Sequence, residues 1–361
     1  MPETFSIAKV AQPHVRAIQP YEPHLYDDVI KLDANENPYP FPEEVLKEIY
    51  ETAAREGFPR YPDPYSTELR AQLENYTGVK AKNILAGNGS DELILSLLLA
   101  FGGPGSRVII PVPTFGMYKM ASLMTGAEPV EVPLKEDYSL DVQRVKAELA
   151  KAGSRVVFLC SPNNPTGNRI PDDEVREICR AAAENAVVIL DEAYSEFAGK
   201  DSAHLLGEFP NLIILRTFSK AFGLAGLRVG YLLTGDEIIA ELLKVKLVYN
   251  LNSFSQIAAR KVLENREVFR KQLEDILREK QGLRAGLEDI PGVRVFPSEA
   301  NYFLIRTEKP AEQVHRKLID QGILVRYLGR GPGLDNCLRI SVGTKEENSE
   351  LLAKLRVIME S

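Results

Sequence analysis

Six short strand-like runs, most of them separated by stretches with helical periodicity, most constrain how this chain folds. They cover residues 107–110, 128–132, 156–160, 187–190, 212–215 and 228–233. Several of these runs are continuously apolar rather than alternating, which is typical of strands covered on both faces. Short strands that alternate with helices form a mainly parallel sheet with helices on both sides. The sequence therefore predicts an α/β fold.

The last part of the chain has a different pattern. A charged helical stretch spans about residues 253–287, and shorter elements follow it. Strands are expected at 293–296, 302–305, 323–325 and 337–341, and helices at about 310–321 and 345–359. A chain of 361 residues suits two domains. We predict a large domain of residues 56–264 and a smaller α+β domain of residues 1–55 and 265–361, with the first 40 residues forming an extended arm.

Composition excludes several classes of function. A net charge of −7 argues against nucleic acid or an acidic membrane as a partner, because both require a basic protein surface. The longest apolar run, residues 93–101, is shorter than the ~20 residues that cross a bilayer. Three cysteines without a C-x-x-C pair and four histidines without an H-x-x-x-H pair argue against disulfides and zinc. We therefore expect a cytoplasmic protein without a metal ion.

Lys220 lies in a run of small residues and hydroxyls, residues 216–228. A lone lysine is most often a solvated surface charge. Two upstream segments change this interpretation: Ser-Pro-Asn-Asn-Pro-Thr-Gly at 161–167 and Ile-Leu-Asp-Glu-Ala-Tyr at 189–194, each at the end of an apolar run. Ligands of parallel sheets bind at the carboxyl ends of the strands. The sequence therefore places an amine, amides and a carboxylate at one candidate site.

These side chains match the needs of pyridoxal phosphate (PLP). Asp191 ends a buried run and needs a cation, which a protonated pyridine nitrogen supplies. An internal salt bridge or a metal would also satisfy this acid. Asn164 and Tyr194 are suited to the ring oxygen, and Lys220 to a Schiff base. Phe115, after the first of the apolar runs, could stack on a flat ring or belong to the core.

Two further groups suit a phosphate. Residues 87–91, Gly-Asn-Gly-Ser-Asp, precede an apolar helix with Ser90 as its expected N-cap, and helix N-termini bind anions. Taken alone, this segment is better explained as a tight turn with a Ser N-cap. Thr217, Ser219 and Arg228 offer hydroxyls and a guanidinium. The chain has no G-x-G-x-x-G spacing there, so a dinucleotide site is weakly supported.

Taken together, these segments resemble the fold-type I, aspartate-aminotransferase-like PLP enzymes over nearly the whole chain. The segments that carry the resemblance are residues 32–39 (Leu-Asp-Ala-Asn-Glu-Asn-Pro-Tyr), 60–63 (Arg-Tyr-Pro-Asp), 89–92, 161–167, 191–194, 219–220 with Arg228, and 337–344. The Asn-Pro-Thr-Gly, Asp-x-x-Tyr and Ser-Lys motifs are typical of the whole superfamily. The first two segments are most similar to its histidinol-phosphate branch.

The resemblance implies a role for each cofactor residue. Lys220 would bind PLP covalently, and Asp191 would pair with the pyridine nitrogen. Asn164 and Tyr194 would bind the ring oxygen, and Phe115 would stack on the ring. The expected catalytic residues are Lys220, Asp191 and Tyr194. The residues implied around the cofactor phosphate are Gly89, Ser90, Asp91, Thr217, Ser219 and Arg228, with Asp91 acting through its backbone.

The resemblance also implies the substrate side and a homodimer. Arg339 would bind the carboxylate of an amino or 2-oxo acid. Arg326 and Tyr21 would help hold a substrate phosphate, and Asn35 would close over the substrate. Tyr61 would cross the dimer interface to the cofactor phosphate of the neighbouring site.

The implied reaction is transamination of L-histidinol phosphate with 2-oxoglutarate. Two relatives on the same fold stay open as alternatives, an aromatic amino acid aminotransferase and a threonine-phosphate decarboxylase. A regulator that keeps the PLP fold would normally add a DNA-binding domain, and the chain has no basic segment for one. The expected partners are therefore a small amino donor, a 2-oxo acid and a second copy of the chain.

Overall fold

The computed structural model describes residues 5–20, 26–329 and 331–361, and within them the strands form two sheets. The larger, called here the large sheet, has the order β2 (Ile84–Gly87), β8 (Gly230–Leu233), β7 (Leu212–Thr217), β6 (Val187–Asp191), β5 (Ser154–Cys160), β3 (Arg107–Val112) and β4 (Glu128–Pro133). From β4 to β7 all neighbours are parallel, whereas β8 is antiparallel to both β7 and β2. The predicted mainly parallel α/β sheet is confirmed.

Side chains of the large sheet alternate between two apolar cores. On β5, Val157 and Leu159 belong to one core, and Val156 and Phe158 to the other. The first core is covered by α3 (Glu43–Glu56), α4 (Thr67–Thr77), α7 (Val142–Leu149), α8 (Asp172–Ala182) and α11 (Ser253–Glu264). The second is covered by α5 (Ser90–Phe101), α6 (Met117–Met124) and α10 (Asp236–Val245). Burial on both faces explains why these strands read as unbroken apolar runs.

The second sheet, called here the small sheet, includes a strand from the start of the chain. Its order is β1 (Ile30–Leu32), β11 (Ile323–Tyr327), β12 (Cys337–Ser341), β10 (Tyr302–Thr307) and β9 (Val293–Val295). Three helices, α12 (Arg266–Glu288), α13 (Ala311–Asp320) and α14 (Lys345–Glu360), pack against it. Strand β1 runs parallel to β11 at the edge, so residues near the start of the chain are fixed by residues near its end.

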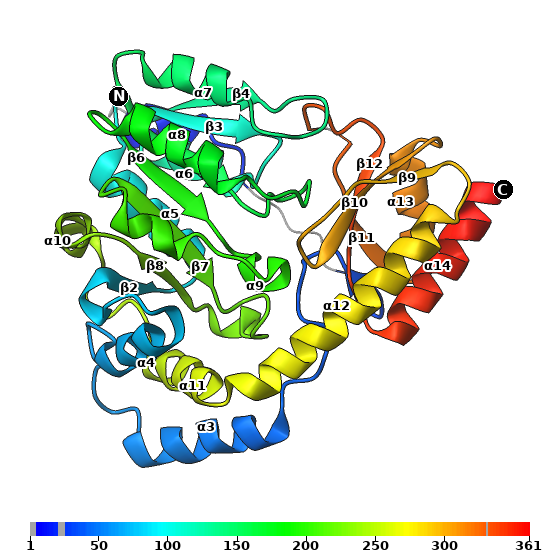
Figure 1. Cartoon of the computed structure of the whole chain (residues 1–361), viewed down its shortest axis with the longest axis horizontal. Helices are drawn as coiled ribbons and strands as arrows, with labels where there is room; N and C mark the ends of the chain where they lie inside the picture. The colour runs from blue at the N-terminus through cyan, green and yellow to red at the C-terminus, as the bar shows by residue number, and fades with distance from the viewer. Residues whose placement is uncertain (1–4, 21–25, 330) are drawn as a thin grey trace.

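Helix α12 joins the two parts of the molecule. Figure 1 shows it in yellow, running from α11 beside the large sheet to the small sheet, where it lies along α14. The predicted single helical stretch of 253–287 is therefore wrong: Asn265, with φ −104° and ψ 26°, separates α11 from α12. The side chain of Asn265 bonds the carbonyl oxygen of Lys261 at 3.0 Å and so caps the first helix.

Several boundaries differ from the prediction for local reasons. β1 and β2, of three and four residues, were not predicted. β8 begins at Gly230 rather than at Arg228, whose φ of 54° is left-handed. Ser90 is the first residue of α5, and Gly89 is the N-cap. The remaining helical turns are α1 (Ile7–Val10), α2 (Pro13–Arg16), η1 (Ala81–Asn83), α9 (Ser195–Ala198), η2 (Ala203–Gly207) and η3 (Ala225–Leu227). Because α1 and α2 lie in the predicted arm, its described part is not fully extended.

The division into two domains stays a prediction. Helix α3 falls in the small domain of that prediction, yet its residues Val45, Ile49 and Ala53 lie in the core beside the large sheet. Within the described residues, no helix is long and apolar enough to cross a membrane.

Candidate functional site

The loops with the predicted chemistry meet at one edge of the large sheet. The register of β5, β6 and β7 pairs Cys160 with Asp191, and Asp191 with Leu215. Because parallel strands end at the same edge, the loop 161–167, Asp191 and the turn with Lys220 follow one another along it. The predicted juxtaposition of these three segments is present in the structure.

The N-terminus of α5 reaches this edge through two glycines. A Cβ added to Gly230, at the start of β8, would lie 2.5 Å from the nitrogen of Ser90. Gly89 has φ 82°, and a Cβ there would lie 2.7 Å from Nη2 of Arg228. Larger residues at these positions would push the helix N-terminus or the guanidinium away. The free N–H groups of that N-terminus favour a bound anion.

Arg228 and Asp91 form an ion pair beside that helix N-terminus. Nη2 of Arg228 donates to Oδ2 of Asp91 at 3.0 Å, and the two side chains are 45% and 42% exposed. The other oxygen of Asp91 is buried, with no hydrogen-bond partner among the described residues. Oγ1 of Thr217 accepts the N–H of Ser219 at 3.1 Å. The candidate anion site therefore contains a guanidinium whose charge is balanced by Asp91, and in a single chain it is partly open to solvent.

Asp191 is a buried carboxylate held by two donors. The hydroxyl of Tyr118 donates to its Oδ2 at 2.6 Å, and the N–H of Ala193 to its Oδ1 at 3.1 Å. Burial raises the pKa of Asp191 to about 6, against the effect of the Tyr118 hydrogen bond. Burial stabilises the neutral form of an acid, so a cation beside Asp191 would favour its charged form.

Lys220 donates from Nζ to the backbone carbonyl oxygen of Ala34 at 2.7 Å. Burial, reinforced by the positive charge of Arg339, lowers the pKa of Lys220 to about 8. At neutral pH a sizeable fraction of this amine is therefore unprotonated, whereas an exposed lysine with its usual pKa is almost fully protonated. An uncharged amine is the form that attacks carbonyl carbon or accepts a proton.

Arg339 lies at the centre of the buried polar group. Its Nη1 donates to Oδ1 of Asn164 and its Nη2 to the carbonyl oxygen of Asp33. Its Nε is buried without a hydrogen-bond partner among the described residues. Burial lowers the pKa of Arg339, while Tyr194 nearby opposes that shift. A buried cation with an unsatisfied donor is suited to a carboxylate ligand.

The segment around Asn35 crosses the site from the small sheet. The side-chain amide of Asn35 donates to Oη of Tyr194 at 2.9 Å. Its N–H donates to Oγ of Ser341 at 2.9 Å, and its carbonyl oxygen accepts the amide of Asn301 at 3.1 Å. Burial raises the pKa of Tyr194 to about 12, so the phenol stays a donor at neutral pH. Asn35 thus links Tyr194 to the small sheet.

The loop 161–167 is fixed from both sheets. The amide of Asn163 donates to the carbonyl oxygen of Pro113 at 2.9 Å, and its side-chain oxygen accepts the Thr114 hydroxyl at 2.7 Å. From the small sheet, the hydroxyl of Tyr302 donates to the carbonyl oxygen of Asn163 at 2.6 Å. The neighbouring Asn164 is therefore held in place by both sheets at once.

The other predicted residues have different positions. Phe115 packs edge-on against Tyr118, with ring centroids 5.5 Å apart. Arg326 on β11 pairs in register with Arg339 on β12, which puts both side chains on one face of the small sheet. Tyr61 is 80% exposed, outside the buried group, and stacks on Tyr249 at 4.4 Å. Tyr21 lies outside the described residues.

Sequence reasoning missed Tyr118, Ser341 and the carbonyl oxygen of Ala34. A signal for Ser341 was available, since it is two residues after Arg339 on a strand and therefore faces the same side. No sequence signal marks Tyr118, because tyrosine in an apolar helix usually belongs to the core. A backbone carbonyl carries no residue signature at all.

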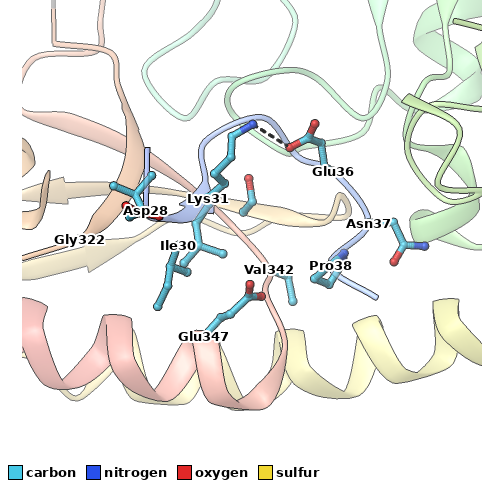
Figure 2. A pocket seen from close by; sticks show the side chains of 12 residues that line it. Asp28, Ile30, Lys31, Glu36, Asn37, Pro38, Gly322, Val342 and Glu347 are labelled. Carbon is cyan, nitrogen blue, oxygen red and sulfur yellow. Dashed lines mark ion pairs between the residues drawn. The ribbon is translucent and has the colours of Figure 1, made fainter. Parts of the chain in front are cut away.

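A cavity of about 460 Å³ lies beside the same arm segment (Figure 2). Lys31 and Glu36, which both line it, form an ion pair of 3.5 Å. None of the predicted site residues in the described chain lines this cavity, although Ser341, which binds Asn35, does. Ser341 therefore links the wall of the cavity to the buried polar group through Asn35.

The residues present fit PLP. The amine of Lys220, the acid of Asp191 and the anion site at the start of α5 correspond to the aldehyde, ring nitrogen and phosphate of that molecule. The unsatisfied atoms of Asp91 and Arg339 show that this polar group is incomplete within the described chain. Among the described residues no group of three or more His, Cys, Asp or Glu could hold a metal ion.

Comparison with known proteins gives the same assignment. The model of the family described as aminotransferase class I and II matches residues 27–355. Histidinol-phosphate aminotransferase 1 of Carboxydothermus hydrogenoformans is 46% identical over 342 residues, which are 95% of this chain and 96% of the relative. Histidinol-phosphate aminotransferase of Thermoanaerobacter sp. is 42% identical over 353 residues, 98% of this chain and 99% of that protein.

The fold is likewise similar to a solved structure. The crystal structure of histidinol-phosphate aminotransferase from Sinorhizobium meliloti, in complex with pyridoxal-5'-phosphate, has a TM-score of 0.89 at 27% identity. The match covers 97% of this chain and 97% of that one.

Proposed function

Because the chain belongs to the class I and II aminotransferase family, we propose that it transfers the amino group of L-histidinol phosphate to 2-oxoglutarate. The products are imidazole acetol phosphate and glutamate, a step of histidine biosynthesis. The alternatives, an aromatic amino acid aminotransferase and a threonine-phosphate decarboxylase, are not favoured, because relatives at 42–46% identity over nearly the full length are named for histidinol phosphate.

The enzyme is PLP-dependent. PLP supplies an aldehyde that condenses with amines and a ring that withdraws electrons from the bound carbon. In our assignment Lys220 holds it covalently, Asp191 pairs with the ring nitrogen, and Asn164 and Tyr194 bind the ring oxygen. Phe115 stacks on the ring. The phosphate binds Gly89, Ser90, Asp91, Thr217, Ser219 and Arg228.

The observation that carries this function is the buried amine of Lys220, which bonds the carbonyl oxygen of Ala34 and whose pKa is lowered to about 8 by burial and by the charge of Arg339. With PLP and substrate bound, the amine of Lys220 would accept a proton at Nζ from the substrate carbon and deliver it to the cofactor carbon that carries the aldehyde. The carbonyl oxygen of Ala34 orients the amine by accepting one of its N–H bonds. Arg339 fixes the carboxylate of 2-oxoglutarate and so aligns the carbon with Nζ.

Arg326 is the residue that we assign to the phosphate of the substrate. It shares a face of the small sheet with Arg339. Arg339 can therefore bind the carboxylate of the 2-oxo acid, and Arg326 and Arg339 together can bind the phosphate of histidinol phosphate. Tyr21 would join them at the phosphate. A guanidinium binds a phosphate with two parallel hydrogen bonds, which gives both affinity and orientation.

Replacement of Arg326 by alanine is expected to separate phosphorylated from unphosphorylated donors. We expect kcat/KM for histidinol phosphate to fall about 10- to 100-fold, the cost of losing hydrogen bonds to a charged group, and the rate on phenylalanine to change little. Steady-state rates on histidinol phosphate, phenylalanine and threonine phosphate with 2-oxoglutarate measure this. Arg306→Ala, on strand β10 of the same sheet, is the control. A wild-type preference for phenylalanine would contradict the proposed substrate.

The second proposal concerns a homodimer in which Tyr61 binds the cofactor phosphate of the neighbouring subunit. Two loops form one exposed apolar surface, defined by Tyr61, Tyr65, Leu247, Val248 and Tyr249, all between 47% and 80% exposed. Lys246 ties these loops together by donating to the carbonyl oxygen of Pro64 at 2.9 Å. Apolar surfaces of this kind mark sites of protein association, and the partly exposed Arg228 leaves room for a further ligand to the phosphate.

This dimer predicts two separable results. Wild-type enzyme should have twice the 40.2 kDa mass of the chain in solution, and Leu247→Asp should shift it towards the monomer. Tyr61→Phe should keep the dimer but weaken PLP binding about 10-fold, since a hydrogen bond to a charged group is lost. Light scattering and PLP titration measure the two effects, with Tyr50→Phe as the exposed-tyrosine control. A monomeric wild type with full PLP affinity would contradict the dimer.

The chain has three buried free cysteines. Because thiols of this kind persist in a reducing compartment, we place the enzyme in the cytoplasm.

A further inference from the structure

We propose that Tyr118 is a positioning residue that holds Asp191 as an oriented anion and thereby keeps the shared proton on the cofactor's ring nitrogen rather than on the acid. The proposal rests on the proposed function for its catalytic meaning. Its structural part, the control of Asp191 by Tyr118, is a property of the protein chain itself. No predicted role had been given to this tyrosine.

The geometry of Tyr118 is unusually well defined. Its ring is fully buried and stacks on Phe158 with centroids 4.4 Å apart and an interplanar angle of 8°. The ring also contacts that of Phe115, at an interplanar angle of 83°. Its hydroxyl ends 2.6 Å from Oδ2 of Asp191. Packing therefore fixes the ring on two sides, and the ring fixes the position of the hydroxyl.

One side chain thus connects two parts of the cofactor site. Phe115 is the residue assigned to the face of the ring, and Asp191 is the residue assigned to its nitrogen. Tyr118 touches both, so the plane of the ring and the direction of the carboxylate are set by the same rigid contact. The N–H of Ala193 on the other carboxylate oxygen prevents rotation of the acid.

The chemical consequence follows because the Tyr118 hydroxyl donates a hydrogen bond to the charged form of Asp191. The Tyr118 hydroxyl can donate but has no reason to lose its proton, because burial and Asp191 raise its pKa well above the usual range. A donor that stays protonated stabilises the carboxylate and makes Asp191 a weaker base. In the acid–nitrogen pair, the proton then remains on the ring nitrogen, where it draws electrons from the reacting carbon. Loss of the hydroxyl would shift that proton towards Asp191.

Other titratable groups near Asp191 do not substitute for this donor. They are Cys160 on β5, Asp91 on α5, Glu192 and Tyr194 after β6, and Tyr302 on β10. Asp91 and Glu192 are acids and raise the pKa of Asp191. The hydroxyls of Tyr194 and Tyr302 are respectively bonded to the amide of Asn35 and to the carbonyl oxygen of Asn163.

Tyr118→Phe tests the proposal with two readouts that do not require turnover. In cofactor-free protein, the infrared carboxyl band of Asp191, identified by its loss in Asp191→Asn, should appear at higher pH in Tyr118→Phe than in the wild type. In the holoenzyme, PLP labelled with ¹⁵N at the ring nitrogen should show a resonance displaced towards the unprotonated position. Tyr138→Phe is the matched control, because Tyr138 is buried outside the site and donates to the carbonyl oxygen of Gly333 at 2.9 Å.

Tyr118→Phe is expected to lower kcat 10-fold or more with a small change in KM. When the same substitution is made in the Asp191→Asn background, it should cause no further loss of kcat. An unchanged carboxyl band in cofactor-free protein would overturn the proposal, and so would an equal loss of kcat in the Asp191→Asn background. A wild type that binds no PLP would refute the proposed function, while the infrared comparison would still decide the role of Tyr118.

Discussion

Lys220→Ala is expected to abolish the visible absorbance of the PLP-bound enzyme and to lower transamination by about 10⁴-fold or more. The variant loses both the covalent anchor of PLP and the group that carries the proton, and general acid–base catalysis alone is worth about 10²–10⁴. Absorption spectra of the purified protein and single-turnover rates with histidinol phosphate measure the two losses. The effect should be seen at every pH, because no other amine in the described site takes this position.

The matched control for that variant is a second buried lysine. Burial lowers the pKa of Lys280 to about 8 as well, and its Nζ donates to the carbonyl oxygen of Ser298 at 2.7 Å. Lys280→Met removes such an amine outside the site and should leave the absorbance in place. Transamination by Lys220→Ala at the wild-type rate would show that the lysine was assigned wrongly.

Asp191→Asn is expected to lower kcat by about 10²–10³-fold, the usual cost of removing one preorganised electrostatic contact from an active site. The amide occupies the same space as the carboxylate but cannot stabilise a protonated ring nitrogen. PLP affinity should fall at the same time, because a buried charge pair is lost. Steady-state kinetics and PLP titration follow the two effects.

The conservative variant distinguishes the charge of Asp191 from its position. Asp191→Glu keeps a carboxylate but displaces it from the Tyr118 hydroxyl and the Ala193 N–H, so it should retain part of the PLP affinity that Asp191→Asn loses. If Asp191→Asn bound PLP and turned over like the wild type, the ring nitrogen would have a different partner.

Much of the site was predictable because of how parallel sheets are built. The apolar runs fix the strands, and strands that run in parallel bring the residues after them to one edge. That rule alone puts the loop 161–167, Asp191 and Lys220 together, without any knowledge of side-chain packing. Arg339 and Asn35 required the resemblance to a family, because they are 304 residues apart, Arg339 on β12 of the small sheet and Asn35 in the segment after β1.

The parts that could not be predicted depend on orientation rather than residue type. The Tyr118 hydroxyl reaches Asp191 only because α6 has one particular rotation against the large sheet, and the apolar pattern of that helix allows several. The Ala34 contact uses a backbone carbonyl, which every residue has. Similarly, α11 ends and α12 begins at Asn265 although the neighbouring residues favour helix. The side-chain amide of Asn265 donates to the carbonyl oxygen of Lys261 and so caps the end of α11.

Strand β1 has a consequence for how the protein is made. Residues 30–32 are synthesised well before their partners, residues 323–325. Asn35 likewise has no partner until Ser341 has been made. Domains usually fold as they emerge, from the N-terminus onwards, but here the segment that contacts Lys220 cannot bind its place in the fold until β11 and β12 have been synthesised. A nascent chain that stops before β12 lacks both Arg339 and the residues that hold the arm, so we expect it to be inactive.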